Sequence, residues 1–484
     1  MKKLTDILKN TPVREVCGDT AAAIGGLVYD SRAVKPGDCF FAVPGTQSDG
    51  HDYIPIAVEK GAAAIVCERM PADAAEGVAY VLVGDSAGAM ADMAAAFYDY
   101  PSRELKLVGI TGTNGKTTTA TLLYDLVRAM GYKAGLISTV VYKIDGREVE
   151  ATHTTPDSIR LNAMMREMVD AGCAYCFMEC SSHAIVQERT RGLDFAGGIF
   201  SNITHDHLDY HKTFAEYIRA KKLFFDGLPK GAFALTNADD RNGRVMVQNT
   251  AAAVSAYSLR AMADFRCKIV EMHLDGMLLR IDGQELWVGL LGRFNAYNLL
   301  AVYGAAALLG LDRGEVLRVL SMLHAVSGRF EKIRAANGTT AIVDYAHTPD
   351  ALENVIQTIE EIRTPGQQLI VVCGCGGDRD RTKRPEMAAI AVKYATTAVF
   401  TSDNPRHESP EAILDDMVAG LEPGARYLRI ADRAEAIRTA VMLSRPGDII
   451  LVAGKGHETY QIVGDVKHPF DDREEIKKRF ALLN

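Results

Sequence analysis

The segment TGTNGKTTT combines glycines, a lysine and several threonines between an apolar run and a helical pattern. The run from Leu105 to Ile110 has the length of a strand, and the amphipathic pattern continues to about Met130. Backbone N–H groups of a glycine loop between a buried strand and a helix start can surround phosphate oxygens. The lysine supplies charge for the outer phosphates, and the first hydroxyl after it can bind Mg²⁺. The residues of the predicted ATP site are Gly112, Thr113, Asn114, Gly115, Lys116, Thr117 and Thr118.

The common pattern for such loops, GxxxxGK[ST], is missed by one position. Ile110 stands where the first glycine is expected, and Gly109 comes one residue early. A glycine-rich turn with an accidental lysine is therefore the alternative interpretation, and the ATP site is the one that we prefer.

Two later segments, each after an apolar strand pattern, carry acidic residues and histidines. Glu179 ends the run GCAYCFM and could orient Mg²⁺ beside the phosphate loop, or be a solvated glutamate at a strand end. The segment from Asn202 to His211 holds three histidines and two aspartates in seven residues. The dinuclear zinc pattern HxHxDH is one residue shorter, so we reject a zinc hydrolase. We single out His207, and we expect His205 and His211 to be capping or surface groups.

Three loops in the last third of the chain each follow a strand pattern. They read DYAHTPD at 344–350, DNPR at 403–406 and GKGHE at 454–458. Each could be a plain turn, but open α/β sheets place their ligands at the carboxyl ends of the parallel strands. An amide, an arginine and a glutamate at such an edge suit a ligand with both carboxylate and ammonium groups.

The composition limits the kind of protein. The 484 residues are 48% hydrophobic and 24% charged, with a formal net charge of −8, which argues against broad binding to nucleic acid. A local basic cluster suits a small anionic ligand instead: Arg379, Arg381, Lys383, Arg384 and Arg406. The first residues, MKKLTDILKN, contain two lysines but no apolar region of the length that a signal peptide has, and no later run approaches about 18 apolar residues, so we expect a cytoplasmic protein without a membrane segment. Nine cysteines without a zinc spacing predict reduced, buried thiols.

The length and the change of pattern along the chain predict three α/β domains. Residues 1–100 form a small N-terminal domain, and residues 101–329 a central ATPase-like domain with a parallel sheet. Between Val254 and Gly289 the period-two alternation with two Asp-Gly turns predicts a β-hairpin excursion. Residues 330–484 repeat the βα alternation and form a Rossmann-like domain.

Together these motifs resemble those of the Mur ligase family, whose members join amino acids to UDP-N-acetylmuramic acid in peptidoglycan synthesis. The motifs stand in family order over nearly the whole chain: TGTNGKTT, ECSSHAIVQER, NITHDHLDYHKTFAEYIRAK, GRFNAYN, SGRFE, DYAHTPD, CGCGGDRDRTKRP, DNPR and GKGHE. The resemblance implies an ATP-dependent amide-bond ligase. Its three domains would bind the uridine nucleotide, ATP and the incoming amino acid in chain order.

The resemblance also implies roles around ATP and two Mg²⁺ ions. The residues around the nucleotide, besides the phosphate loop, would be Asn295, Asn298, Asp344 and His347. The residues that serve the Mg²⁺ ions would be Thr117, Glu179, His207 and a carbamylated Lys221. The implied catalytic residues are Lys116, Lys221, His207 and Glu179.

The implied site for UDP-N-acetylmuramoyl-L-alanyl-D-glutamate spans two domains. The nucleotide end would contact Ser31, Thr46, Gln47 and Ser48. The muramyl dipeptide end would contact His153, Thr154, Thr155, Ser181, Gln187 and Arg189. The family commonly has Asn before its TTP motif, where this chain has His153.

The pocket for the incoming amino acid is implied by a last set of matches: Arg379, Asp403, Asn404, Pro405, Arg406, Gly454 and Glu458. In the family, DNPR accompanies meso-2,6-diaminopimelate, because the arginine can pair with the second carboxylate. L-Lysine is the alternative amino acid, and a folylpolyglutamate synthetase-like ligase is a more distant alternative. A nucleotide-gated regulator or chaperone is the alternative from another class. We expect a monomer that works through an acyl phosphate.

Overall fold

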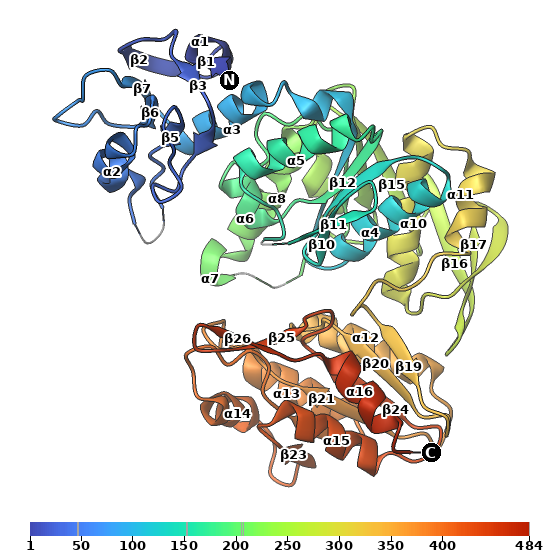
Figure 1. Cartoon of the computed structure of the whole chain (residues 1–484). Helices are drawn as coiled ribbons and strands as arrows, with labels where there is room; N and C mark the ends of the chain where they lie inside the picture. Colours follow the sequence, from blue (N-terminus) through green and yellow to red (C-terminus); the bar gives the residue numbers. More distant parts are fainter. Residues whose placement is uncertain (46–47, 152, 205, 207, 484) are drawn as a thin grey trace.

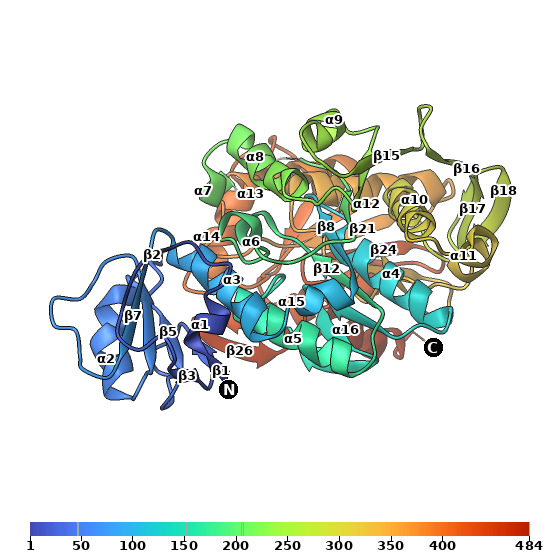
Figure 2. The ribbon, with the colours of Figure 1, turned by 90° about the horizontal axis from the view of Figure 1, so that it is seen from above.

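The structure is a computed structural model that describes residues 1–45, 48–151, 153–204, 206 and 208–483. The described chain forms three lobes, each built on one larger sheet, which is the mixed α/β fold that the sequence predicts (Figure 1). The N-terminal lobe runs from β1 to α3, the central lobe from η2 to α11 and the C-terminal lobe from β19 to α16. Figure 2, seen from above, shows the N-terminal lobe projecting to one side and the central lobe in front of the C-terminal lobe.

The N-terminal lobe has a five-stranded sheet of order β2-β7-β6-β5-β4, parallel except for β2. Its last helix, α3, starts at the side-chain cap of Asp85 and packs against α5 of the central lobe. The elements are β1 (Lys2–Lys3), α1 (Leu4–Ile7), β2 (Val13–Cys17), β3 (Ala23–Ile24), β4 (Leu27–Val28), β5 (Cys39–Phe41), η1 (Gly50–Tyr53), α2 (Ile54–Glu59), β6 (Ala64–Cys67), β7 (Ala79–Val83) and α3 (Ser86–Phe97).

The central lobe is organised around an 11-stranded sheet of order β11-β10-β9-β12-β8-β13-β14-β15-β16-β17-β18. The strands from β9 to β16 in this order are parallel, and antiparallel hairpins extend the sheet at both edges. The elements are η2 (Pro101–Glu104), β8 (Lys106–Thr111), α4 (Lys116–Ala129), β9 (Ala134–Ile137), β10 (Val141–Ile144), β11 (Arg147–Glu150), α5 (Ser158–Asp170), β12 (Tyr175–Glu179), α6 (Ser182–Val186), β13 (Gly197–Phe200), α7 (Leu208–His211), α8 (Phe214–Asp226), β14 (Phe233–Asn237), α9 (Gly243–Val247), β15 (Ala253–Ser258), β16 (Phe265–His273), β17 (Gly276–Ile281), β18 (Gln284–Val288), α10 (Arg293–Leu308) and α11 (Arg313–Leu320).

The predicted hairpin excursion is confirmed in β16, β17 and β18. Asp282 and Gly283 join β17 to β18 with φ values of 47° and 86°, the backbone of a tight hairpin turn. A second hairpin, β10–β11, turns at Asp145 and Gly146 in the same way, and the sequence analysis did not predict it.

The C-terminal lobe has a six-stranded sheet of order β19-β20-β24-β21-β22-β23, parallel except for β19. The carboxyl ends of β20, β24, β21 and β22 therefore meet at one edge, as predicted for their loops. The elements are β19 (Glu331–Arg334), β20 (Thr340–Asp344), α12 (Pro349–Ile362), β21 (Leu369–Cys373), α13 (Lys383–Tyr394), β22 (Thr397–Phe400), α14 (Pro410–Val418), β23 (Tyr427–Arg429), α15 (Arg433–Leu443), β24 (Ile449–Ala453), β25 (Tyr460–Val463), β26 (Val466–Pro469) and α16 (Asp472–Phe480).

The central strands β8, β12, β21 and β24 are buried except for Lys106 at the start of β8, so their apolar side chains form the cores beneath the loops. The predicted buried thiols are confirmed, because all nine cysteines are free and eight of them are buried. Within the described ranges, no helix has the length and apolar character needed to span a membrane.

Candidate functional site: a phosphate loop beside a cavity between two lobes

The predicted phosphate loop lies between the buried strand β8 and the first turn of α4. Gly112 and Gly115 have φ values of 150° and 87°. A Cβ atom on Gly112 would lie 1.9 Å from Ser201 Oγ, and one on Gly115 would lie 2.5 Å from Asn298 Oδ1. Both positions therefore require glycine, and the loop presents its backbone N–H groups at a helix start.

Two residues at the end of β13 hold this loop, and the sequence analysis missed both. Ser201 Oγ donates to Asn114 O at 2.6 Å. The amide of Asn202 accepts from Asn114 N at 3.0 Å and donates to Asn114 O at 3.1 Å. Ser201 and the start of the NITHDH segment thus hold the phosphate loop in place through hydrogen bonds to its backbone.

Two lysines converge on one carbonyl of the loop. Lys116 donates to Gly112 O at 2.9 Å and to Thr113 O at 2.8 Å. Lys221, on α8 and 1% exposed, donates to the same Gly112 O at 2.7 Å. Burial lowers the pKa of both amines, and the nearby charge of Lys116 lowers the pKa of Lys221 further.

Glu179 is fully buried at the end of β12. Its Oε1 accepts from Thr139 N at 2.7 Å, whereas its buried Oε2 has no hydrogen bond with any described residue. A buried carboxylate oxygen without a donor fits the coordination of a hard cation such as Mg²⁺. Thr117 is buried at the start of α4, and Arg329 donates to its Oγ1 at 3.2 Å.

His207, the remaining predicted metal residue, lies outside the described residues, as does His205. Among the residues that are described, no group of three His, Cys, Asp or Glu side chains could hold a metal ion. The expectation of a surface or capping role for His211 is wrong. Its ring is buried and contacts Ser182 Oγ of α6 at 2.9 Å and the ring of Tyr217 of α8, the helix against which α7 packs.

The residues predicted around the nucleotide come from two lobes: Asn295 and Asn298 from the central lobe, and Asp344 and His347 from the C-terminal lobe. Asn298 contacts Asn295 through a 3.1 Å hydrogen bond and lies against Gly115. Asp344 accepts from the backbone of Phe330 and Ala346 at 2.7 and 2.8 Å, and burial raises its pKa to about 6. The ring of His347 contacts Tyr345 O at 2.8 Å.

A cavity of about 790 Å³ is lined by the C-terminal lobe and by the central lobe. The predicted site residues on its walls are Thr154, His347, Arg379, Asp403, Asn404, Arg406, Gly454 and Glu458. Further lining residues belong to two segments that the sequence analysis singled out without giving these residues a role of their own: Thr204 and Asp206 of NITHDH, and Tyr345 and Asp350 of DYAHTPD. Pro405 is buried in the DNPR loop.

The phosphate loop contacts a wall residue of this cavity. Asn114 Nδ2 and Thr204 Oγ1 donate to the same oxygen of Asp350, at 3.0 and 3.2 Å. Arg329, whose Nη2 reaches Thr117, also has its guanidinium 4.5 Å from the ring of Tyr345. The nucleotide side and the C-terminal loops therefore meet at one place.

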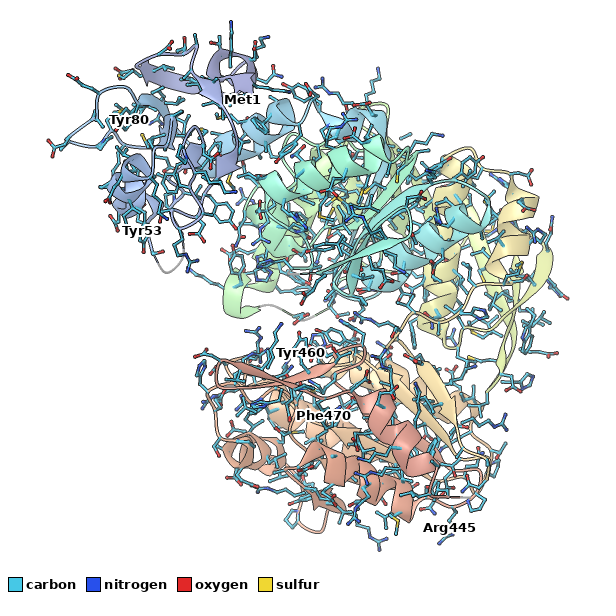
Figure 3. The ribbon with its side chains drawn as sticks, in the orientation of Figure 1. Met1, Tyr53, Tyr80, Arg445, Tyr460 and Phe470 are labelled. Atoms are coloured by element: carbon cyan, nitrogen blue, oxygen red, sulfur yellow. The ribbon has the colours of Figure 1, made fainter. Side chains whose placement is uncertain are left out.

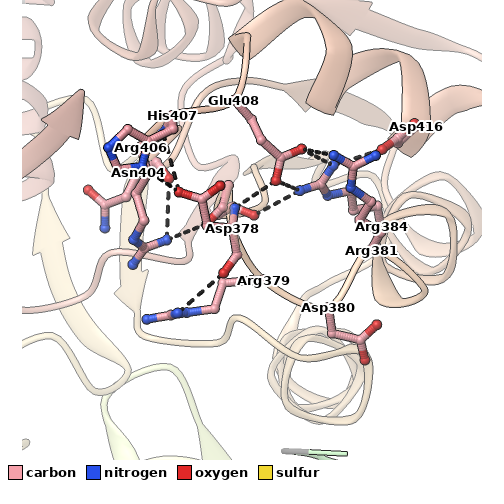
Figure 4. A network of polar contacts seen from close by, with 12 residues as sticks. Asp378, Arg379, Asp380, Arg381, Arg384, Asn404, Arg406, His407, Glu408 and Asp416 are labelled. Atoms are coloured by element: carbon pink, nitrogen blue, oxygen red, sulfur yellow. Dashed lines mark hydrogen bonds and ion pairs between the residues drawn. The ribbon is translucent and has the colours of Figure 1, made fainter. Parts of the chain in front are cut away.

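The predicted basic cluster divides into two groups. Arg379, Lys383 and Arg406 line the cavity. Arg381 and Arg384 instead pair with Glu408, and Arg384 is fully buried with Asp416 as a second partner (Figure 4). The expectation that all five would serve an anion is therefore wrong for these two, since carboxylates of the same lobe neutralise them.

The residues predicted for the dipeptide end lie close to the carboxyl end of β12. Thr155 Oγ1 donates to Glu179 O at 2.7 Å and lies 3.4 Å from Ser181 Oγ. Arg189 donates to Thr155 O at 2.7 Å and to Gln187 Oε1 at 2.6 Å. The backbone of His153 is held by the hydroxyl of Tyr142, and Thr154 receives a hydrogen bond from Thr139.

The residues predicted for the nucleotide end are less fully described. Ser31 is buried in a turn and Ser48 is exposed, while Thr46 and Gln47 lie outside the described residues. Tyr29 is a neighbour that the sequence analysis missed. This half-exposed residue of the N-terminal lobe has a raised pKa, because partial burial and the charge of Asp157 raise it while the charge of Arg189 lowers it.

Comparison with known proteins gives three family matches in chain order. The model for the Mur ligase family catalytic domain matches residues 23–98, the Mur ligase middle domain residues 110–306 and the Mur ligase glutamate ligase domain residues 328–456.

Two bacterial relatives are similar over nearly the whole chain. A Phocaeicola vulgatus protein named UDP-N-acetylmuramoyl-L-alanyl-D-glutamate–2,6-diaminopimelate ligase is 55% identical over 481 residues, with 99% of each chain covered. The Bacteroides fragilis protein of the same name is 55% identical over 482 residues, again with 99% of each covered. A solved structure with that name in its title has a TM-score of 0.71 at 31% identity and covers 100% of this chain and 99% of its own. The chain therefore belongs to the Mur ligase family.

Proposed function

We propose that the chain is the ligase that adds meso-2,6-diaminopimelate to the D-glutamate side chain of UDP-N-acetylmuramoyl-L-alanyl-D-glutamate, at the expense of ATP. The observation that carries the proposal is the shared cavity. Its walls hold the loops expected to bind a zwitterionic amino acid, and Asp350 on its wall contacts the phosphate loop. The names of relatives more than half identical over nearly the whole chain support the same activity.

The reaction couples phosphoryl transfer to amide formation. The terminal phosphoryl group of ATP moves to an oxygen of the D-glutamate side-chain carboxylate, giving an acyl phosphate and ADP. Lys116, whose ammonium is held by two carbonyls of the phosphate loop, would turn to the phosphates and neutralise their charge. An amine of diaminopimelate then attacks the acyl carbon, phosphate leaves and the amine loses its proton. Closure of the lobes would exclude water, which otherwise hydrolyses the acyl phosphate.

Two Mg²⁺ ions would be held by Thr117, Glu179, His207 and Lys221, and they would neutralise charge on the transferred phosphoryl group. The unpartnered Oε2 of Glu179 supports this assignment. Lys221 fits only if its amine carries a carbamate, since an ammonium would repel the cations. Its burial and lowered pKa favour the neutral amine that reacts with CO₂.

The other lobes complete the proposal. The N-terminal residues Ser31, Thr46, Gln47 and Ser48 would bind the uridine nucleotide, and the Thr155–Arg189 cluster would bind the dipeptide. We further propose domain boundaries near 100/101 and 329/330, a monomer and a cytoplasmic location.

The proposal is tested by the product that forms from a mixture of equal concentrations of meso-diaminopimelate and L-lysine with ATP, Mg²⁺ and the UDP-dipeptide. Mass spectrometry should find the mass of diaminopimelate added to nearly all product. A product that carries lysine would favour the lysine-adding alternative, and no ligated product with either amino acid would refute the ligase proposal.

A further inference from the structure

Lys455, in the GKGHE loop, has no part in the proposed ligation reaction. Its side chain is 0% exposed. The ammonium donates to Asn404 Oδ1 at 3.0 Å and to Glu458 Oε2 at 2.9 Å, and Asp403 Oδ1 lies 4.0 Å away. Burying a lysine is costly unless such partners compensate the loss of water. The ammonium is therefore bound to the residues of the amino-acid pocket itself.

These contacts fix the orientation of the Asn404 amide. Oδ1 accepts from Lys455 and from the backbone N–H of Ile462 at 2.9 Å, so Nδ2 faces the other way and donates to Glu458 Oε2 at 2.9 Å. A flipped amide would set its NH₂ group against two donors. Within the described chain, the second hydrogen of Nδ2 and the Oε1 atom of Glu458 have no hydrogen bond, and both residues line the cavity.

We infer that Lys455 is a positioning residue that determines which group of the amino-acid pocket donates a hydrogen bond to the ligand and which group accepts one. It makes Asn404 a donor for a carboxylate and leaves one oxygen of Glu458 as an acceptor for an ammonium group, so the pocket takes a zwitterion in one orientation. The inference rests on the proposed function. The pocket lies beside the β25–β26 hairpin, whose Tyr460 is on the side of the C-terminal lobe that faces the central lobe (Figure 3).

The test compares two lysines near the same tyrosine ring. The ammonium of Lys455 lies 5.7 Å from the ring of Tyr460, and that of the exposed Lys467 lies 4.4 Å from it. Lys455→Met should raise the KM for diaminopimelate about 10- to 100-fold, the range for loss of a charge-assisted hydrogen bond. The KM values for ATP and the UDP-dipeptide should stay within about twofold, because their sites keep every contact. Lys467→Met should behave as the wild type.

A purely structural lysine would give a different result, since its loss would lower the folded fraction or change all three KM values together. Lys455→Gln, whose amide can still donate to Glu458, repeats the comparison if Lys455→Met does not fold. A wild-type KM for diaminopimelate in a folded variant would overturn the inference, and so would loss of folding in both variants. Failure of the wild type to ligate diaminopimelate would refute the proposed function instead.

Discussion

In the proposed function, Arg406 is the residue that we expect to decide the choice of amino acid. It lies in the cavity wall with φ of 51°, and its Nη1 donates to Gly377 O at 2.8 Å, which directs the guanidinium (Figure 4). A guanidinium fork can bind the second carboxylate of diaminopimelate, a group that lysine lacks.

Arg406→Ala should therefore raise the KM for diaminopimelate about 10- to 100-fold while the KM for ATP is unchanged. Arg406→Lys should recover only part of the loss, because it keeps the charge but not the fork. Arg438, which makes an exposed ion pair with Glu435, is the control position for arginine removal. Wild-type kinetics for Arg406→Ala at low diaminopimelate concentration would count against the assignment.

Lys221 should carry a carbamate in the working enzyme. NMR of the protein in ¹³C-bicarbonate should show a carbamate signal that is absent from Lys221→Met. The adjacent Lys222 is the matched control, because its ammonium pairs with Asp226 on the surface of α8. Lys221→Met should also lose about 100-fold or more in kcat, as expected when charge stabilisation of the transferred group is removed. Full activity without bicarbonate and without the signal would exclude the modification.

At the scale of elements, an ion-pair network fastens the loop after β21 to the DNPR loop. Glu408 accepts from Asp378 N at 2.6 Å and pairs with Arg384 and Arg381 (Figure 4). The pKa of Glu408 is lowered to about 2, and the hydrogen bonds from Arg384 are the largest cause. The network thereby holds Arg379 and Arg406 on the cavity wall.

Glu408→Gln should loosen residues 376–384 in a pH-dependent way. Because the folded-state pKa is lower than the unfolded value of about 4.3, the carboxylate contributes stability above that pH and loses it as the pH falls toward 2. Hydrogen–deuterium exchange should therefore show faster exchange than wild type at pH 7, by about 1–3 kcal/mol of opening free energy, and a difference about half as large near pH 3, where part of the contribution is already lost. An equal difference at both pH values would contradict this role.

The sequence predicted most elements because their signals are local. Buried strands, the turns that follow them and the Asp-Gly hairpin turn at 282–283 are all short-range patterns. The β10–β11 hairpin had the same signal in Asp145-Gly146, which was overlooked. The roles of Asn202 and Lys455 could not be predicted in this way, since Asn202 binds Asn114, which is 88 residues away in the chain, and Lys455 orients Asn404, which is 51 residues away. The burial of His211 likewise depends on how α7 packs against α8, which no local pattern encodes.

At the scale of the whole molecule, the cavity between the central and C-terminal lobes must close for the reaction. The reacting atoms have to approach to about 3–3.5 Å with water excluded, whereas the cavity has a volume of about 790 Å³. The radius of gyration from small-angle X-ray scattering should fall when a non-hydrolysable ATP analogue, Mg²⁺, the UDP-dipeptide and diaminopimelate are all present. Each ligand alone should give a smaller change, and an unchanged radius with all of them would argue against closure.

The central claim is that the phosphate loop and the amino-acid cavity form one coupled site, and substrate omission tests it most directly. Phosphate release should require ATP, the UDP-dipeptide and meso-diaminopimelate together, with about one ligated product for each phosphate, as a shared acyl phosphate demands. Rapid phosphate release that is independent of diaminopimelate, or that yields no ligated product, would show that the two regions do not act as one site.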